Sequence, residues 1–238
     1  MRGFRLSDRM EAVAEMVPFG VRVADVGCDH AYVSIYLADH KGCTVYATDL
    51  RDGPLAIAME NIKEAGLEEK IDIIKSDGLK GIEAGDIDAV VIAGMGGLLI
   101  RDILDSSKNI VDDLKYLILQ PQSEISELRR FIHSIGFDMV DEDMVWDDGK
   151  PYFMMRCEKA SKILCWSDIE YSYGKRLIEK KHPGLLVYLK RRLDTLKEIE
   201  KNLKNSCMSE KVKERIATIE QEEMGIKDVL SRFAKEED

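Results

Sequence analysis

The residues best suited to chemistry form a short turn that follows an apolar run near the N-terminus. In VADVGCDHAYVSIYLADH, at 23–40, the apolar residues give way to GCDH at 27–30. A glycine, a carboxylate and an imidazole at a strand end can bind a cofactor, bind a metal ion or close a tight corner. A turn that binds a dinucleotide pyrophosphate carries GxGxxG instead, because the backbone must approach the phosphates. This turn has one glycine, and its acids, Asp25 and Asp29, would repel a pyrophosphate.

Acidic residues at this place are suited to a ligand that carries positive charge. S-adenosylmethionine (SAM) presents an ammonium and a sulfonium group, which carboxylates attract. Two further strand ends are acidic: ATDL places Asp49 where a ribose diol could donate hydrogen bonds, and SDGL places Asp77 and Gly78 where an adenine amino group could bind. Each aspartate alone is also explained as a helix N-cap or an acidic surface turn. The three strand ends together favour a SAM pocket.

The fourth strand ends in AGMGG, at 93–97, which is an unusual group of glycines. Enzymes that methylate exocyclic amines often carry an Asn/Asp-Pro-Pro-aromatic motif there, and this chain does not. Glycines would leave the backbone close to the ligand and open space in front of the methyl group. A flexible turn is the alternative. The fifth strand ends in LQPQS, which brings Gln120 and Pro121 to the same edge of the sheet.

Strands and helices that alternate along the chain must position these turns. A helix is expected after Ser7, ending at Pro18. Apolar runs predict strands at about 21–26, 43–48, 71–74, 87–93 and 115–119. Helical patterns lie between them, near 31–40, 54–66, 97–105 and 123–135. This alternation predicts a mostly parallel sheet covered by helices.

Two period-2 runs flank Asp148-Gly149-Lys150 and predict an antiparallel hairpin at the end of this sheet. Such a sheet is the outline of the α/β class I SAM-dependent methyltransferase fold, which is Rossmann-like. Dehydrogenase Rossmann domains usually continue with another βαβ half instead.

From Cys165 onward the strand patterns end and three- and four-residue apolar spacing begins. This spacing predicts an αα-hairpin of coiled-coil type. Its expected apolar seam consists of Leu186, Leu189, Leu193, Leu196 and Leu203, and then of Val212, Ile216, Ile219, Ile226, Leu230 and Phe233. We therefore expect a Rossmann-like, SAM-binding catalytic domain at 1–160 and a helical hairpin domain at 161–238.

The net charge of −10 conceals a basic stretch in the predicted hairpin, because 175–215 holds 13 Lys and Arg against 6 Asp and Glu. An acidic protein with one basic stretch is unlike a general nucleic-acid coat. The hairpin is expected to dock RNA through phosphate contacts, with Lys190, Arg191 and Arg192 as candidates. A solvated coiled-coil surface is the alternative.

Composition excludes several other classes. The five cysteines are odd in number, scattered and outside any CxxC pair, which favours reduced thiols and argues against a structural zinc site. No metal is expected. The sequence has no run of about eighteen apolar residues, and its first residues do not open a signal peptide. We expect a cytoplasmic monomer with no membrane partner.

The segments RLSDRMEAVAEMV, VADVGCDHAYVSIYL, IDAVVIAGMGG and LILQPQ, followed by the helical hairpin, closely resemble the bacterial tRNA (adenine(22)-N(1))-methyltransferases (TrmK-like). The resemblance covers essentially the whole chain. It implies a SAM-dependent enzyme that methylates N1 of adenine 22 in tRNA, with a coiled-coil extension that helps to recognise the tRNA. The matching motif positions are Gly27, Asp29, His30, Asp77, Gly78, Gly94, Met95 and Gln120. One departure is at the end of the second strand, where the family often has Glu-Val-Asn and this chain has Thr48-Asp49-Leu50.

The expected reaction needs an extracted adenine whose N1 lies in line with the sulfonium methyl group. Asp29 is the candidate for stabilising the cationic product ring, and His30 could orient Asp29 or contact RNA. Gly27, Asp49, Asp77, Gly78, Gly94 and Met95 are expected to bind SAM together with Asp29, while Arg9, Gln120 and Pro121 should meet the substrate. Two alternatives remain: a SAM-dependent methyltransferase of a small molecule or protein, and a non-catalytic SAM-fold binding module.

Overall fold

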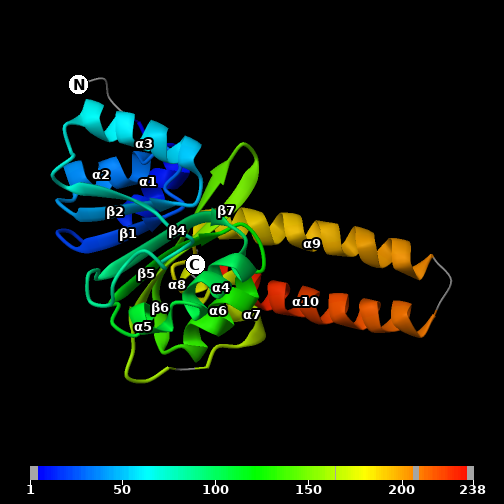
Figure 1. Cartoon of the computed structure of the whole chain (residues 1–238). Helices are drawn as coiled ribbons and strands as arrows, with labels where there is room; N and C mark the ends of the chain where they lie inside the picture. The colour runs from blue at the N-terminus through cyan, green and yellow to red at the C-terminus, as the bar shows by residue number, and fades with distance from the viewer. Residues whose placement is uncertain (1–4, 164, 206–208, 235–238) are drawn as a thin grey trace. The chain divides into compact units, whose positions relative to one another are not determined.

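A computed structural model describes residues 5–163, 165–205 and 209–234 of the chain (Figure 1). The chain divides into two compact units, Met1–Leu164 and Cys165–Asp238. The division falls a few residues after the boundary expected at 160. Each unit has buried apolar residues of its own.

Among the described residues, the first unit is built on a seven-stranded sheet in the order β3-β2-β1-β4-β5-β7-β6. The strands are β1 (Arg22–Val26), β2 (Thr44–Asp49), β3 (Ile71–Lys75), β4 (Ala89–Met95), β5 (Tyr116–Pro121), β6 (Phe137–Asp147) and β7 (Lys150–Lys159). β1 to β5 pair in parallel, whereas β7 pairs antiparallel with both β5 and β6. The strand order reverses between β1 and β4, which is where open α/β sheets bind their ligands.

The antiparallel end of the sheet follows from a two-residue turn. Asp148 and Gly149 both have positive φ, 47° and 72°, as a type I′ turn requires. The turn joins Asp147 directly opposite Lys150 and sets the register of β6 on β7. The predicted hairpin and the predicted fold class are confirmed.

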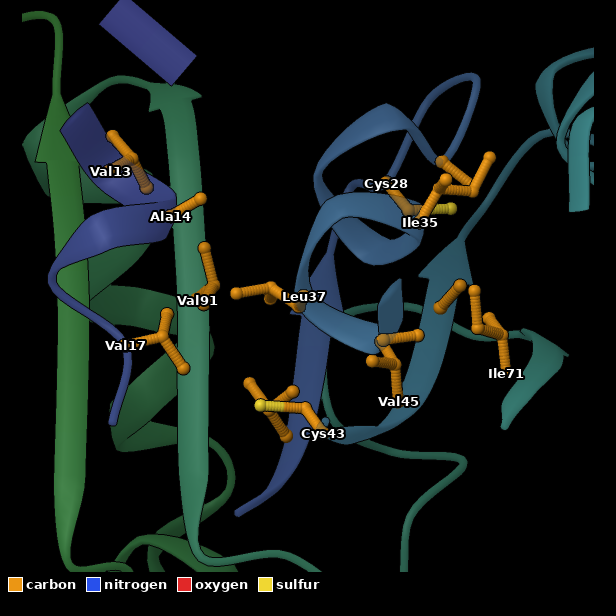
Figure 2. Close-up of a cluster of buried hydrophobic side chains, with 14 of the residues drawn as sticks. Val13, Ala14, Val17, Cys28, Ile35, Leu37, Cys43, Val45, Ile71 and Val91 are labelled. Atoms are coloured by element: carbon orange, nitrogen blue, oxygen red, sulfur yellow. The ribbon is translucent and has the colours of Figure 1, made fainter. Parts of the chain in front are cut away.

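Helices cover both faces of the sheet (Figure 1). One face carries α1 (Asp8–Glu15), α2 (Tyr32–His40) and α3 (Asp52–Ala65), and the other carries α4 (Gly97–Asp105), α5 (Lys108–Val111) and α6 (Ile125–Ser134). Alternate strand residues supply the two faces. Val91 belongs to the apolar cluster under α1 and α2, which Figure 2 shows with Val13, Leu37 and Val45.

A buried ammonium group ties α1 to the end of α2. The Lys41 side chain is 2% exposed, and its Nζ donates to the carbonyl oxygens of Ala14 and Glu15 at 3.1 and 2.6 Å. The same Nζ lies 3.3 Å from Glu15 Oε2. The last carbonyls of a helix have no intrahelical donors, so Lys41 provides donors for the final turn of α1.

The second unit contains α7 (Asp168–Tyr173), α8 (Lys175–Glu179), α9 (Pro183–Lys204) and α10 (Glu210–Ala234). α9 and α10 pack along one another as the predicted helical hairpin (Figure 1). The two helices are joined through residues 205–209, of which 206–208 fall outside the described residues.

The apolar seam of this hairpin differs in part from the prediction. The buried apolar residues are Leu185, Leu189 and Leu196 of α9 and Ile216, Ile219, Ile226 and Val229 of α10. The members of the predicted seam that are only half-buried are Leu186, Leu193, Leu203, Val212, Leu230 and Phe233. The prediction left out Leu185 and Val229, which are both fully buried and each next to a predicted residue. At 3.6 residues per turn, one residue moves a side chain by about a quarter of the helix circumference.

Arg192 forms a bidentate ion pair across the hairpin. Its Nε and Nη2 atoms donate to Glu222 Oε1 and Oε2 at 2.8 and 3.0 Å, and the Tyr173 hydroxyl donates to Glu222 Oε1 at 2.6 Å. Burial alone would raise the pKa of Glu222, but the hydrogen bonds from Arg192 and Tyr173 outweigh it and lower that pKa. The three residues join α7, α9 and α10.

Lys41→Met should destabilise the first unit, because it leaves the carbonyls of Ala14 and Glu15 without these donors. A loss of about 2–3 kcal/mol is expected for charged hydrogen bonds of this kind, which corresponds to a fall of roughly 5–10 °C in thermal midpoint. Circular dichroism melting measures it. Lys108→Met is the matched control, since the Lys108 side chain is 75% exposed and its pairing with Asp112 should contribute little. Equal midpoints for the two variants would show that α1 is held by its apolar face alone.

Candidate active site

The turn after β1 is tight and partly left-handed. Gly27 has φ +74°, and a Cβ there would overlap the methyl group of Met95. The amides of Gly27 and Cys28 both donate to the carbonyl oxygen of Thr48, at 2.8 and 2.9 Å, which ties the turn to β2. Asp29 also has positive φ, 51°, which is uncommon for a residue with a side chain. The backbone is thus strained at the residue predicted to act in catalysis.

A cavity of about 200 Å³ opens beside this turn. Its walls are the N-terminal segment 5–7, Met10 of α1, Asp25 at the end of β1, the turn residues 27–30, the start of α2, and Ala93 of β4. The cavity thus brings together Gly27, Asp29 and His30, as predicted from their spacing. The contribution of residues 5–7 was not foreseen, because no local pattern connects them with β1.

The buried acid of this cavity is Asp25, which is 5% exposed. Burial raises the pKa of its carboxyl group to about 6, against the opposing effect of hydrogen bonds from Ser34. The Ser34 hydroxyl donates to Asp25 Oδ2 at 2.6 Å. A carboxylate with a pKa raised by burial inside a cavity is a strong candidate for a functional residue.

Asp29 and His30 lie at the exposed rim. Their side chains are 62% and 38% exposed, and His30 Nε2 lies 3.8 Å from Asp29 Oδ1. The His30 carbonyl accepts a hydrogen bond from Asn61 of α3 at 2.9 Å, which holds the turn from the other side. Arg51 Nη2 also lies 3.8 Å from Asp29 Oδ1. The rim therefore offers an accessible carboxylate with an imidazole and a guanidinium group nearby.

The acids at the ends of β2 and β3 have different surroundings. Asp49 is 6% exposed, and its Oδ1 accepts from the Arg51 amide at 2.9 Å. Asp77 is exposed and pairs with Lys80 at 2.5 Å. The Gly78 carbonyl accepts from the Ser76 hydroxyl at 3.1 Å. None of Asp49, Asp77 and Gly78 is among the cavity-lining residues, although Arg51 connects Asp49 with Asp29.

The glycine-rich turn after β4 is tied to the end of β5. Gly97 donates to the Ser123 carbonyl at 3.0 Å, and Gln122 donates to the Met95 carbonyl at 2.8 Å. A Cβ at Gly97 would lie 2.5 Å from the Ser123 carbonyl oxygen, so no other residue fits without movement. The alternative of a flexible turn is not supported by these contacts, since the two strand ends are held to each other.

The side-chain amide of Gln120 contributes to this edge by hydrogen bonds to backbone groups. It is fully buried, and its Oε1 accepts from the Gly94 amide at 3.1 Å while its Nε2 donates to the Pro121 carbonyl at 3.2 Å. Gln120 therefore connects the end of β4 to the end of β5. The sequence placed Gln120, Pro121, Gly94 and Met95 at one edge of the sheet, and the pairing of Met95 with Pro121 agrees with this.

The remaining predicted substrate residues are of two kinds. Arg9 of α1 lies with its guanidinium 4.5 Å from the centre of the Tyr152 ring of β7, in a cation–π contact. Lys190 and Arg191 are exposed on α9. Arg192, by contrast, is committed to its pair with Glu222, so it stabilises the hairpin whatever else it contacts.

Within the described ranges, no group of three or more His, Cys, Asp or Glu side chains could hold a metal ion. No helix in these ranges is long and apolar enough to cross a membrane.

The order of the strands, the antiparallel hairpin and the acidic turn after β1 define a class I methyltransferase fold. The family profile described as tRNA (adenine(22)-N(1))-methyltransferase matches residues 23–224. The chain belongs to this family, which confirms the resemblance and the enzyme class predicted from the sequence.

Individual relatives support the same family assignment. The tRNA (adenine(22)-N(1))-methyltransferase of Bacillus subtilis (strain 168) is 35% identical over 175 residues, which are 73% of this chain and 74% of that protein. A solved structure of a Listeria monocytogenes serotype 4b protein has a TM-score of 0.91 at 30% identity, covering 95% of this chain and all of that one. Streptococcus pneumoniae Sp1610 in complex with S-adenosyl-L-methionine has a TM-score of 0.83 at 29% identity, with coverage of 95% and 100%.

Asp25→Asn should stabilise the ligand-free protein at pH 8. The pKa of this carboxyl group is raised on folding, so its ionised form destabilises the fold above about pH 6, and this effect disappears as the pH falls below the unfolded value near 3.8. The gain should be about 1–3 kcal/mol at pH 8 and much smaller at pH 4. Thermal melting at both pH values measures it.

Asp88→Asn is the control of opposite sign. Hydrogen bonds from Arg22 and Lys115 lower the pKa of Asp88, so its carboxylate stabilises the fold at pH 8 and this contribution is lost on acidification. A lower midpoint for Asp25→Asn at pH 8 would show that burial of the Asp25 charge is fully compensated.

Proposed function

We propose that the cavity beside β1 holds the methionine part of SAM and that the nucleoside part extends along the ends of β2 and β3. In this arrangement Asp25 faces the ammonium group, Asp49 the ribose diol, and Asp77 with Gly78 the adenine. The single observation that carries the proposal is the buried carboxylate of Asp25 in a cavity whose walls include Gly27 and Asp29. The complex of the S. pneumoniae relative with S-adenosyl-L-methionine supports it.

The reaction is a direct transfer of one methyl group to a tRNA adenine. The N1 lone pair attacks the sulfonium methyl carbon, the carbon–sulfur bond breaks, and S-adenosylhomocysteine leaves with the electron pair. Positive charge moves from sulfur to the purine ring. The enzyme therefore needs alignment and a nearby negative charge rather than a covalent nucleophile.

Asp29 supplies that charge in the proposed mechanism. It lies at the rim between the cavity and solvent, with a positive φ and a side chain that is 62% exposed. His30, 3.8 Å away, orients Asp29 or contacts the RNA. Cys28 is no nucleophile, because burial and the carboxylates of Asp25, Asp49 and Asp29 raise the pKa of its thiol far above neutrality.

The turn of β4 favours N1 over the exocyclic N6 as the acceptor. Methylation of an amine benefits from oxygens that accept the amine protons, whereas the carbonyl oxygens of Met95 and Gly96 already accept from the amides of Gln122 and Ile100. The glycines of this turn carry no side chains, and Met95 of the turn pairs with Pro121 of β5. In the proposed complex the N1 edge of adenine 22 approaches this turn.

The product should be 1-methyladenosine at position 22. Purified enzyme, SAM and a tRNA transcript with A22 are incubated, and digested nucleosides are resolved by mass spectrometry. The matched control is the same tRNA with G22, which should remain unmethylated. N6-methyladenosine as the main product, or equal methylation of both transcripts, would refute the proposed acceptor.

The helical hairpin is proposed as a tRNA-docking arm, and the enzyme as a cytoplasmic monomer without a membrane partner. The arm carries more Lys and Arg than Asp and Glu across 175–215. Lys190 and Arg191 are exposed on α9, away from the buried stripe of Leu185 and Leu189. Such side chains contact backbone phosphates and give affinity without base specificity.

Lys190→Ala with Arg191→Ala should weaken tRNA binding and reduce its salt slope by about 2, because two phosphate contacts are lost. Filter binding between low and moderate salt measures both quantities, and calorimetry should give unchanged SAM affinity. Arg192 is left intact, since its loss would unpair Glu222 and disturb the hairpin.

Lys227→Ala with Arg232→Ala is the matched control: both residues are exposed on α10 and lie outside the basic stretch at 175–215. If the two double variants bind tRNA alike and with the slope of the parent, the hairpin is a structural element and not a docking arm.

A further inference from the structure

Ser34 is a buried polar residue within the apolar part of α2. It is 0% exposed, as are its neighbours Leu37 and Ala38 on the same buried face. A hydroxyl in such a place needs a hydrogen-bond partner, since an unpaired buried polar group is costly. The partner of Ser34 is Asp25 Oδ2, at 2.6 Å.

The contact brings Asp25 to the beginning of a helix. The N-cap of α2, Ala31, has no side chain that could accept from the first-turn amides, and Ser34 lies in that first turn. The hydroxyl and the backbone amide of Ser34 both favour the charged form of Asp25. Carboxylates are stabilised at helix N-termini by the amides and by the helix dipole. Ser34 is not itself a cavity-lining residue, so any effect on a ligand passes through Asp25.

We propose that Ser34 is a positioning residue for the methyl donor: its hydroxyl fixes Asp25 Oδ2, so that the carboxylate presents its charge to the ammonium group of SAM. The inference rests on the proposed placement of SAM beside Asp25. It assigns to one hydroxyl the task of keeping a buried acid charged and oriented at neutral pH.

The pH dependence of SAM affinity tests this role. The pKa of Asp25 is about 6, so SAM affinity of the parent protein should fall about tenfold between pH 7.5 and pH 5. Ser34→Ala removes a hydrogen bond that favours the carboxylate, so the midpoint of this fall should rise by about one pH unit. At pH 5 the variant should bind SAM about a hundredfold more weakly than at pH 8. At pH 8 its affinity should be close to that of the parent.

The other ionisable side chains at the cavity belong to Arg5, Tyr32 and the turn residues Cys28, Asp29 and His30. The negative charge of Asp49 of β2 is one of those that raise the pKa of the Cys28 thiol. Histidine changes charge in this pH range, so both profiles are also measured in a His30→Asn background. Ser34→Cys, nearly isosteric with a weak S–H donor, should give an intermediate midpoint.

Isothermal titration calorimetry with SAM between pH 5 and pH 8 distinguishes the outcomes. An upward shift in Ser34→Ala, persisting in the His30→Asn background, supports the positioning role. Equal weakening at every pH would show that Ser34 is only structural, and an unchanged profile would show that it is dispensable. In Asp25→Asn, SAM affinity should no longer fall on acidification. If SAM affinity of the parent protein does not fall on acidification, the placement of SAM beside Asp25 is overturned. The nucleoside assay tests the methyltransferase activity separately.

Discussion

A buried negative charge at the end of β1 is the constraint to which the rest of the site is adapted. Folding places Asp25 where its carboxylate is least stable, with its pKa raised by burial to about 6. Only the hydroxyl and amide of Ser34 oppose this among the causes of the shift. A protein keeps such a group when a cationic ligand uses it, since proteins tolerate some instability at functional sites. The tight turn at Gly27 and the start of α2 enclose this charge.

The opposite side of the site is organised by backbone contacts. Gly94, Gly97 and Gln122 all make hydrogen bonds between the ends of β4 and β5, and the buried amide of Gln120 is part of the same set. The acceptor base would therefore meet a preformed surface rather than a loop that must be ordered. Preorganisation of this kind aligns the acceptor base with the methyl group without a reacting side chain. Methyl transfer from a sulfonium needs this alignment.

The parts predicted from sequence were those determined by local patterns. Alternating elements gave the sheet, and acids after apolar runs gave Gly27, Asp29 and Asp49 at strand ends. The partners of long side chains were not predictable, because tertiary contacts decide them. Arg192 looked like any other exposed cation but pairs with Glu222, and Asp49 proved buried. The predicted α9 seam left out the buried Leu185, because apolar spacing alone did not distinguish it from Leu186.

The attachment of α1 has a consequence for the order in which the chain is assembled. The helix emerges from the ribosome before Lys41, its anchor 27 residues further along the sequence than Ala14, has emerged. Until that ammonium group arrives, these donors are missing from the last carbonyls of α1, the helix that contributes Met10 to the cavity wall. Because synthesis proceeds from the N-terminus, a later part of the chain completes the attachment of this cavity wall. Its first-made wall is held in place only after the segment that follows α2 has emerged.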